Sequence, residues 1–440
     1  MPEHADDPVV IVGMALEAPG GIDTSARYWA LLAEEREALG PIPTDRGWPV
    51  AELLDGSRRD GFKPLCDSGG FLSGAAEFDP GFFRISPREA VAMDPQQRVA
   101  LRLAWRALED AGINPDELAG HDAGVYLGAS DTGYGPDMAE YSAHSGHLMA
   151  GTALSVISGR IAYTLGLAGP ALTVDTSCSS ALSALHLAVQ AIRSGDCDLA
   201  ITGGVCVMGS PGFFVEFAKQ HALSDDGRCR PYSADATGTV WAEGAALFVL
   251  QRKSAALRDG RHRYGEILAS CLNQDGRTAG LMTPSADAQQ RLLRRALAGA
   301  GLRPAQVGMI EGHGTATRVG DPVELRALRA VYGDDTARRA GPRLGSVKSN
   351  IGHTQAAAGA LGLAKVLLAA DQRTIPASLH LRGRRCAGMD RDGGLQLADT
   401  AAPWPALDGR RVGAVSAFGM SGTNAHLIVA VPEPEPAQAC

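Results

Sequence analysis

The sequence lacks the features that mark a membrane protein or a nucleic-acid-binding protein. Its longest apolar stretch, residues 356–370, is too short to cross a bilayer and is interrupted by Lys365. Basic residues are not in excess, because 41 Lys and Arg stand against 49 Asp and Glu, a net charge of −8. The short acidic start, residues 1–7, is not a signal peptide. We therefore expect a cytoplasmic protein with neither a membrane nor a nucleic acid as partner.

Closely paired cysteines are also missing. None of the eight cysteines lies at the CxxC spacing of a zinc site, so we expect no bound metal. Scattered thiols in so long a chain are typical of a reducing compartment, which again indicates the cytoplasm. The cysteines are Cys66, Cys178, Cys197, Cys206, Cys229, Cys271, Cys386 and Cys440.

What the chain does have is the pattern of an α/β protein. It has 440 residues, of which 45% are hydrophobic, enough for a large core. Short apolar runs at residues 9–12, 123–127 and 198–204 predict buried strands. Residues 94–111 have the apolar spacing of an amphipathic helix. Because such strands and helices alternate along the chain, we expect α/β architecture.

Cys178 lies in the most informative segment, residues 174–181 (VDTSCSSA). Residues 169–174 predict a short buried strand, and the residues after Cys178 predict a helix that ends at Gly195. The cysteine is therefore expected in the first turn of a helix, where N–H groups stabilise a thiolate and lower its pKa. From this segment alone, a nucleophile and an ordinary buried core cysteine are equally good interpretations.

Two histidine-bearing segments decide between these interpretations. They are residues 311–324 (EGHGTATRVGDPVE) and 345–354 (GSVKSNIGHT). With the Cys178 segment they resemble the active-site motifs of β-ketoacyl synthases, especially the ketosynthases of modular polyketide synthases. The resemblance covers nearly the whole chain. It includes the further segments 7–15 (DPVVIVGMA), 93–98 (MDPQQR), 273–276 (NQDG) and 416–426 (SAFGMSGTNAH).

The resemblance implies a fold and a division of the chain. It implies the thiolase fold, two similar halves packed as a layered αβαβα sandwich, although the two halves show little sequence similarity. We expect residues 8–255 to form the half with the cysteine and residues 262–432 the half with the two histidines. Residues 433–440 form a Pro/Glu-rich tail. The acyltransferase and linker sequences usual after such domains are missing, so we expect either a free-standing ketosynthase, which we favour, or a domain excised from a longer protein.

The resemblance also assigns the catalytic residues. Cys178 takes the acyl group, and His313 and His353 hold a malonyl thioester and assist its decarboxylation. His353 precedes a helix predicted over residues 355–370, so we expect its imidazole to be neutral. Lys348 and Glu324 match the positions of a buried ion pair. Without the resemblance, each of these four side chains would equally suit an ordinary core or surface position.

Further roles follow from the remaining motif positions. Thr315 and Thr317 match threonines that bind the amides of the pantetheine arm, although loop threonines often only form turns. Met420, beside Gly419, matches a residue whose N–H serves the oxyanion hole and whose side chain gates the acyl pocket. The resemblance implies no cofactor on this chain, because the substrates are carried on the phosphopantetheine of an acyl carrier protein.

Several positions depart from the usual pattern. Ser177 stands where Ala is usual, Gly312 where Ala is usual, and Ala316, Val240 and Ala242 where Gly is usual. None of these changes removes a catalytic group. They do put the usual elongation substrates in doubt.

The leading interpretation is a condensing enzyme that joins a Cys178-bound acyl chain to a malonyl-type unit. The alternative is a ketosynthase that transfers an acyl chain between carrier proteins, or to a release nucleophile, without extending it. A chain-length factor would lack the cysteine, and a thiolase would need a second catalytic cysteine in a matching motif. The resemblance also implies a homodimer, in which the strand that precedes the cysteine, residues 171–175, lies at a sheet edge and pairs with its twin.

Overall fold

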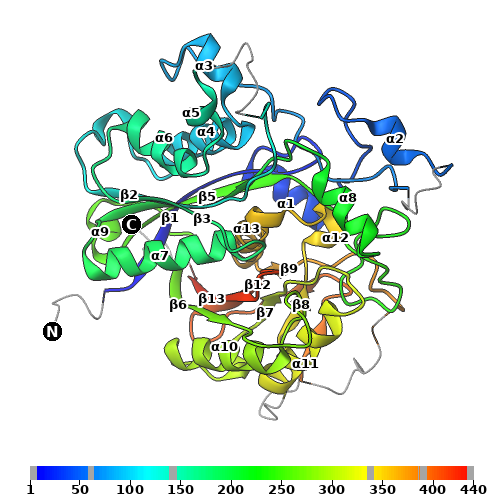
Figure 1. Cartoon of the computed structure of the whole chain (residues 1–440). Helices are drawn as coiled ribbons and strands as arrows, with labels where there is room; N and C mark the ends of the chain where they lie inside the picture. The colour runs from blue at the N-terminus through cyan, green and yellow to red at the C-terminus, as the bar shows by residue number, and fades with distance from the viewer. Residues whose placement is uncertain are drawn as a thin grey trace.

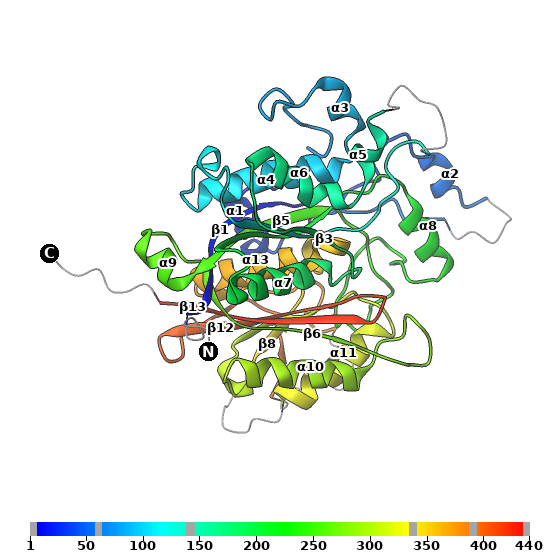
Figure 2. The ribbon, with the colours of Figure 1, turned by 60° about the vertical axis from the view of Figure 1, so that its left-hand side comes forward.

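The computed structural model describes residues 7–57, 64–137, 146–333, 341–384, 386 and 394–433. Residues 434–440 of the predicted tail lie outside them. Figure 1 and Figure 2 show two sheets with helices between and outside them. The sheets join into one through a short antiparallel contact, in which Val10 pairs with Glu266 and Ile11 with Gly265.

The first half of the chain contributes five strands to this sheet. They are β1 (Val9–Glu17), β2 (Ala123–Gly128), β3 (Ala171–Val174), β4 (Leu199–Cys206) and β5 (Gly244–Arg252). Their order in space is β1-β5-β4-β2-β3. The pairs β1–β5 and β5–β4 are antiparallel, whereas β4–β2 and β2–β3 are parallel. The strands are long and buried, except β3 at the edge.

The second half repeats this topology strand for strand. Its strands are β6 (Gly265–Gln274), β7 (Met309–Glu311), β8 (Arg343–Gly345), β12 (Arg410–Phe418) and β13 (Thr423–Pro432), followed at the edge by β10 (Gln396–Leu397). They lie in the order β6-β13-β12-β7-β8-β10, with the same alternation of antiparallel and parallel pairs. The internal repeat that the resemblance implied is therefore present in the topology. The predicted boundaries 8–255 and 262–432 stay a prediction.

Helices form three layers around the two sheets. One outer layer is α4 (Pro95–Asp110) with α6 (Ser155–Leu165), and the other is α10 (Ala286–Gly299) with α11 (Gly320–Tyr332). Between the sheets lie α7 (Ser180–Ser194) and α13 (Ala358–Asp371), as Figure 2 shows. Helix α13 is buried over almost its whole length because it has sheet strands on both sides. The layered α/β thiolase fold predicted from the motifs is confirmed.

The remaining elements are short. They are α1 (Ser25–Ala33), α2 (Val50–Leu54), α3 (Pro87–Ala92), η1 (Pro115–Glu117), α5 (Leu148–Thr152), α8 (Gly212–Lys219), α9 (Lys253–Arg258), η2 (Pro304–Gln306), α12 (Lys348–Ile351), η3 (Gln355–Ala357), β9 (Thr374–Ile375) and β11 (Ala402–Pro403). None of the helices in the described residues is long and apolar enough to span a membrane.

Two local predictions around the cysteine were wrong. Strand β3 is not buried, because it forms the edge of the sheet and leaves Leu172 48% exposed. Cys178 does not lie in the first turn of α7, because Ser179 is the N-cap and the helix begins at Ser180. The cysteine occupies the turn before the helix.

The repeated topology brings the three motif segments together. Cys178 follows β3 and leads into α7 in the first half, whereas His353 follows β8 and leads into α13 in the second. These are equivalent positions in the two halves. His313 follows β7, the parallel neighbour of β8. Because α7 and α13 pack against each other between the sheets, their N-terminal ends face one shared cavity.

Candidate active site

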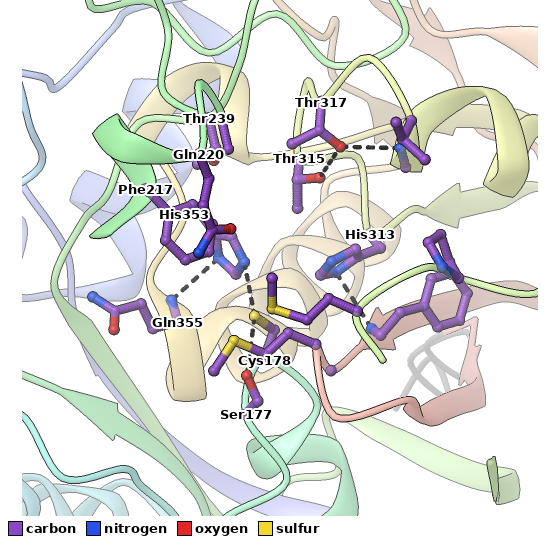
Figure 3. Close-up of a pocket in the computed structure, with 18 of the residues that line it drawn as sticks. Ser177, Cys178, Phe217, Gln220, Thr239, His313, Thr315, Thr317, His353 and Gln355 are labelled. Atoms are coloured by element: carbon purple, nitrogen blue, oxygen red, sulfur yellow. Dashed lines mark hydrogen bonds between the residues drawn. The ribbon is translucent and has the colours of Figure 1, made fainter. Parts of the chain in front are cut away.

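A cavity of about 520 Å³ opens beside Cys178. It is lined by the motif residues of both halves and by aromatic side chains, among them Cys178, His313, His353, Thr315, Thr317, Met420, Gly419, Glu324, Phe217 and Trp241. Figure 3 shows the two imidazoles and the thiol pointing toward one another. The separate sequence motifs therefore meet in one place.

The thiol of Cys178 is surrounded by hydrogen-bond donors. His353 Nε2 lies 3.2 Å from its Sγ and Ser177 Oγ lies 3.7 Å away. The backbone N–H groups of Cys178 and Met420 also face the sulfur. Gly419 permits this approach, since a Cβ there would lie 2.1 Å from the carbonyl oxygen of Thr176.

The prediction that the pKa of the thiol is low is wrong. Burial raises the pKa of Cys178 above its ordinary value, because a thiolate loses its hydration there. The Ser177 hydroxyl, the charge of Lys348 and the two N–H groups lower the pKa but do not outweigh burial. The sequence pattern missed this because burial depends on the second half of the chain.

Both histidines accept a backbone N–H on Nδ1. The N–H of Gln355 donates to His353 Nδ1 at 3.2 Å, and that of Phe418 donates to His313 Nδ1 at 3.4 Å. A nitrogen that accepts carries no proton, so in each neutral ring the proton is on Nε2. The rings lie 5.5 Å apart at 86° to each other. Each therefore offers an N–H donor at the cavity.

Burial keeps both rings neutral. It lowers the pKa of His313 and of His353 well below the ordinary value, and the positive charge of Lys348 lowers both further. The expected neutrality of His353 thus has burial as its main cause rather than the helix that follows. An extended bridge between Trp241 and His353 holds the second ring, with the N–H of His353 donating to the carbonyl of Val240 at 2.7 Å.

Lys348 and Glu324 are buried as predicted, but no ion pair within 4 Å joins them in the described residues. Glu324 instead accepts the N–H groups of His313 at 2.7 Å and Gly314 at 2.9 Å, and the hydroxyl of Tyr232 at 2.9 Å. The carboxylate thus fixes the backbone that carries His313. The two charges still act on each other, because Lys348 acts to lower the pKa of Glu324 and Glu324 acts to raise the pKa of Lys348. The buried ion pair implied by the resemblance stays a prediction.

The buried ion pair of this region is between Lys365 and Glu311. Lys365 Nζ lies 2.7 Å from Glu311 Oε2, and neither side chain is more than 2% exposed. The two atoms are close but not aligned for a hydrogen bond, so the attraction is between the charges. Glu311 also accepts the Val347 N–H at 2.6 Å, which ties the end of β7 to the start of α12. The sequence signal was Lys365 itself, the one charge in a long apolar run.

Tyr232 is a second residue that the sequence analysis missed. It is fully buried beside Gly312, where a Cβ would lie only 1.9 Å from the Tyr232 hydroxyl oxygen. The glycine at this unusual position therefore makes room for the phenol that donates to Glu324. No local pattern pointed to Tyr232, because its partner is 92 residues away.

Thr315 and Thr317 lie at the cavity with their hydroxyl oxygens 3.2 Å apart, as Figure 3 shows. Thr317 also accepts the N–H of Gly320 at 3.1 Å. Between them Ala316 has a φ of 61°, a left-handed conformation that costs a non-glycine residue about 1–2 kcal/mol. The described residues contain no cluster of three or more His, Cys, Asp or Glu side chains that could hold a metal.

Family models match most of the chain. The family models for the Beta-ketoacyl synthase N-terminal and C-terminal domains match residues 6–256 and 264–382. The chain belongs to the β-ketoacyl synthase family, which comprises condensing enzymes of the acyltransferase type.

Its curated relatives are parts of very long proteins. The chain is 49% identical to Erythronolide synthase EryA3 of Saccharopolyspora erythraea over 99% of its own length, and 48% identical to Mycoketide-CoA synthase of Mycobacterium tuberculosis over 98%. It spans only 14% and 10% of these relatives.

The solved structures that it resembles are ketosynthases. The ketosynthase from module 6 of the bacillaene synthase of Bacillus subtilis is 38% identical, with a TM-score of 0.88 over 97% of this chain and 73% of that one. The oxazolomycin ketosynthase domain OzmH KS7 of Streptomyces albus is also 38% identical, with a TM-score of 0.90 over 99% and 77%.

The Lys365–Glu311 pair makes a stability prediction. Lys365→Met should lower the free energy of unfolding by about 3–5 kcal/mol, because it leaves the Glu311 carboxylate buried without its counter-charge. Urea unfolding followed by fluorescence measures this. The control is Lys253→Met, which breaks the half-exposed Lys253–Glu266 pair at 3.0 Å and should cost under ~1 kcal/mol.

Adding Glu311→Gln to Lys365→Met should recover part of the loss, since no charge is then left alone. If Lys365→Met and Lys253→Met lowered the free energy of unfolding equally, the buried pair would contribute no more to stability than the half-exposed pair.

Proposed function

We propose that this chain is a polyketide β-ketoacyl synthase that catalyses decarboxylative Claisen condensation. It joins an acyl chain on Cys178 to a malonyl-type unit on an acyl carrier protein. The observation that carries the proposal is the pair of neutral imidazoles, His313 and His353, whose Nε2–H groups meet at the cavity beside the thiol. Two such donors suit an enolate oxygen, where negative charge develops.

The first half-reaction loads the enzyme. The Cys178 thiol loses its proton to solvent, and the thiolate attacks the carbonyl carbon of an acyl thioester. The N–H groups of Cys178 and Met420, which both face the sulfur, stabilise the oxyanion. The carbon–sulfur bond to the pantetheine breaks, its thiolate takes up a proton, and the acyl group stays on Cys178. Met420 is 43% exposed at the cavity, where it gates entry of the acyl chain.

The second half-reaction makes the carbon–carbon bond. A malonyl-type thioester enters with its pantetheine arm against Thr315 and Thr317. As carbon dioxide leaves, its bonding electrons move onto the thioester, and the Nε2–H groups of His313 and His353 hydrogen-bond the enolate oxygen. The enolate carbon attacks the Cys178 thioester, and the sulfur leaves as a thiolate. The β-ketoacyl product remains on the carrier protein, and the thiolate is ready for the next acyl chain.

Lys348 and Glu324 support this step without touching the thiol. The positive charge of Lys348 disfavours a second positive charge on either imidazole, so both keep the role of neutral donor. Glu324 holds the backbone N–H groups of His313 and Gly314. The seven described cysteines are all free thiols, which supports a reducing, cytoplasmic location.

His313→Ala should separate the two half-reactions. Acyl loading of Cys178 should persist, because the nearest donor to the sulfur is His353 rather than His313. Release of carbon dioxide from malonyl carrier protein should fall by roughly 10²–10³-fold, because one enolate donor is gone. Intact-protein mass spectrometry measures the loading, and labelled carbon dioxide measures the release.

The matched control is His186→Ala, since His186 bonds Ser270 away from the cavity. It should leave both steps unchanged. Normal decarboxylation by His313→Ala would remove His313 from the proposed role.

A second experiment decides between elongation and transfer. The acyl-loaded enzyme is mixed separately with malonyl and methylmalonyl carrier proteins. Mass spectrometry then measures the mass of the group bound to the carrier arm. An enzyme that only transfers acyl chains forms no enolate and has no need for two donors to an enolate oxygen. We therefore expect a β-ketoacyl product with at least one extender. An unextended acyl group on a non-malonylated carrier, with no β-keto product, would support the transfer alternative instead.

We propose further that the chain is a homodimer joined through β3. This strand lies at the edge of the sheet, and among the described strands β2 is its one neighbour, so pairing with a second copy satisfies the backbone groups on its other side. Light scattering at micromolar concentration should give twice the chain mass of 45.7 kDa.

Leu172→Lys places a charge on this edge, where the leucine is 48% exposed, and should yield monomers. The control is Leu257→Lys on α9, which is 54% exposed on a helix and should leave the dimer intact. A mass of 45.7 kDa for the unmodified chain would contradict the dimer.

A further inference from the structure

Ser177 presents its hydroxyl to the thiol of Cys178. Its Oγ lies 3.7 Å from Cys178 Sγ, and Figure 3 shows the two side chains next to each other. Within the described part of the chain, this sulfur is the one hydrogen-bond partner of the hydroxyl. The hydroxyl can therefore hydrogen-bond the sulfur in both its thiol and its thiolate form.

The backbone of Ser177 is held so that the side chain keeps this direction. Its φ is 61°, a left-handed conformation that is uncommon for a residue with a side chain. The Asp175 carboxylate accepts the Ser177 N–H at 2.8 Å, and the Ser177 carbonyl accepts the hydroxyl of Ser180 at 2.5 Å and its N–H at 3.0 Å. Hydrogen bonds on both sides therefore maintain a strained residue next to the nucleophile.

We propose that Ser177 is a further catalytic residue, whose hydroxyl donates a hydrogen bond to the Cys178 thiolate and so favours the attacking form. The proposal rests on the proposed function in one respect, that Cys178 is the nucleophile. The thiol loses its proton to solvent, the thiolate accepts the Ser177 O–H, and its electron pair forms the bond to the acyl carbon. Once acylated, the sulfur has no negative charge, so the hydrogen bond acts on loading and not on decarboxylation.

The electrostatic balance at the sulfur supports this role. Burial raises the pKa of Cys178, and among the groups that oppose burial the Ser177 hydroxyl has the largest effect, ahead of Lys348. The neutral His353 also donates to the sulfur, at 3.2 Å. A hydrogen bond to a charged acceptor such as a thiolate is stronger than one to a neutral acceptor. Because few donors face the sulfur, each of them has a large share in stabilising the thiolate.

Few other groups titrate near the sulfur. His353 and His313 remain neutral at ordinary pH, since burial lowers the pKa of each. Cys206 on β4 is buried and burial raises its pKa well above the ordinary value. Lys348 on α12 faces the thiol as a positive charge. The exposed Asp175 carboxylate holds the Ser177 N–H. Asp131, Arg318 and Glu324 are further charged residues that line the same cavity.

The test is the pH dependence of Cys178 alkylation by iodoacetamide, followed by mass spectrometry on the whole chain. For Ser177→Ala we expect the profile to move to higher pH, with alkylation roughly three- to tenfold slower at pH 8. The limiting rate at high pH should be unchanged, because there the thiol is fully ionised. Ser177→Gly should behave alike, and it accepts the positive φ without strain.

The control is Ser183→Ala, which removes a buried hydroxyl that bonds Thr176 at 2.9 Å and does not face the sulfur. Its profile should coincide with that of the unmodified chain. Unmoved profiles for both Ser177 variants, or rates lowered equally at every pH, would overturn the proposal. If the profile shifts but the chain neither loads nor condenses acyl groups, the hydrogen bond from Ser177 to the Cys178 thiolate is supported and the proposed function is refuted.

Discussion

Each of the two cavity imidazoles accepts a backbone N–H on Nδ1, and the chemistry of the site depends on this contact. Gln355 supplies the N–H to His353, and Phe418 supplies it to His313. The contact assigns the single proton of each neutral ring to Nε2, which lies at the cavity. Burial and the charge of Lys348 prevent a second proton from binding. The two imidazoles are therefore hydrogen-bond donors through Nε2–H, and they cannot accept the proton of the thiol.

The duplicated topology explains why these groups meet. In each half the strand at the equivalent position, β3 or β8, leads toward a helix of the central layer, α7 or α13. In the first half the connection carries Cys178, and in the second it carries His353. The same architecture therefore carries a nucleophile, Cys178, in the first half and a hydrogen-bond donor, His353, in the second half. The buried charge pair of Lys365 with Glu311 then links the central helix α13 to the end of β7, close to His313.

The sequence was sufficient for those parts of the site that local patterns carry. Cys178 follows a predicted strand, His353 precedes a predicted helix, and the motifs around Cys178 and both histidines are contiguous. What the sequence could not give depends on contacts between distant segments. The hydroxyl of Tyr232 reaches Glu324 from 92 residues away, and the raised pKa of Cys178 follows from burial by both halves. The residue pattern of β3 did not show its exposure, because an apolar strand looks alike at the centre and at the edge of a sheet. Its edge position came only from the resemblance.

The central claim is that His313 and His353 are neutral Nε2–H donors. Nuclear magnetic resonance of the chain labelled with ¹⁵N-histidine tests it most directly, with His313→Ala and His353→Ala used to assign the signals. Both rings should show a protonated Nε2 and an unprotonated Nδ1, unchanged between pH 6 and pH 8, since burial keeps each pKa well below about 6.5. An imidazolium signal for either ring in this range, or a proton on Nδ1, would contradict it.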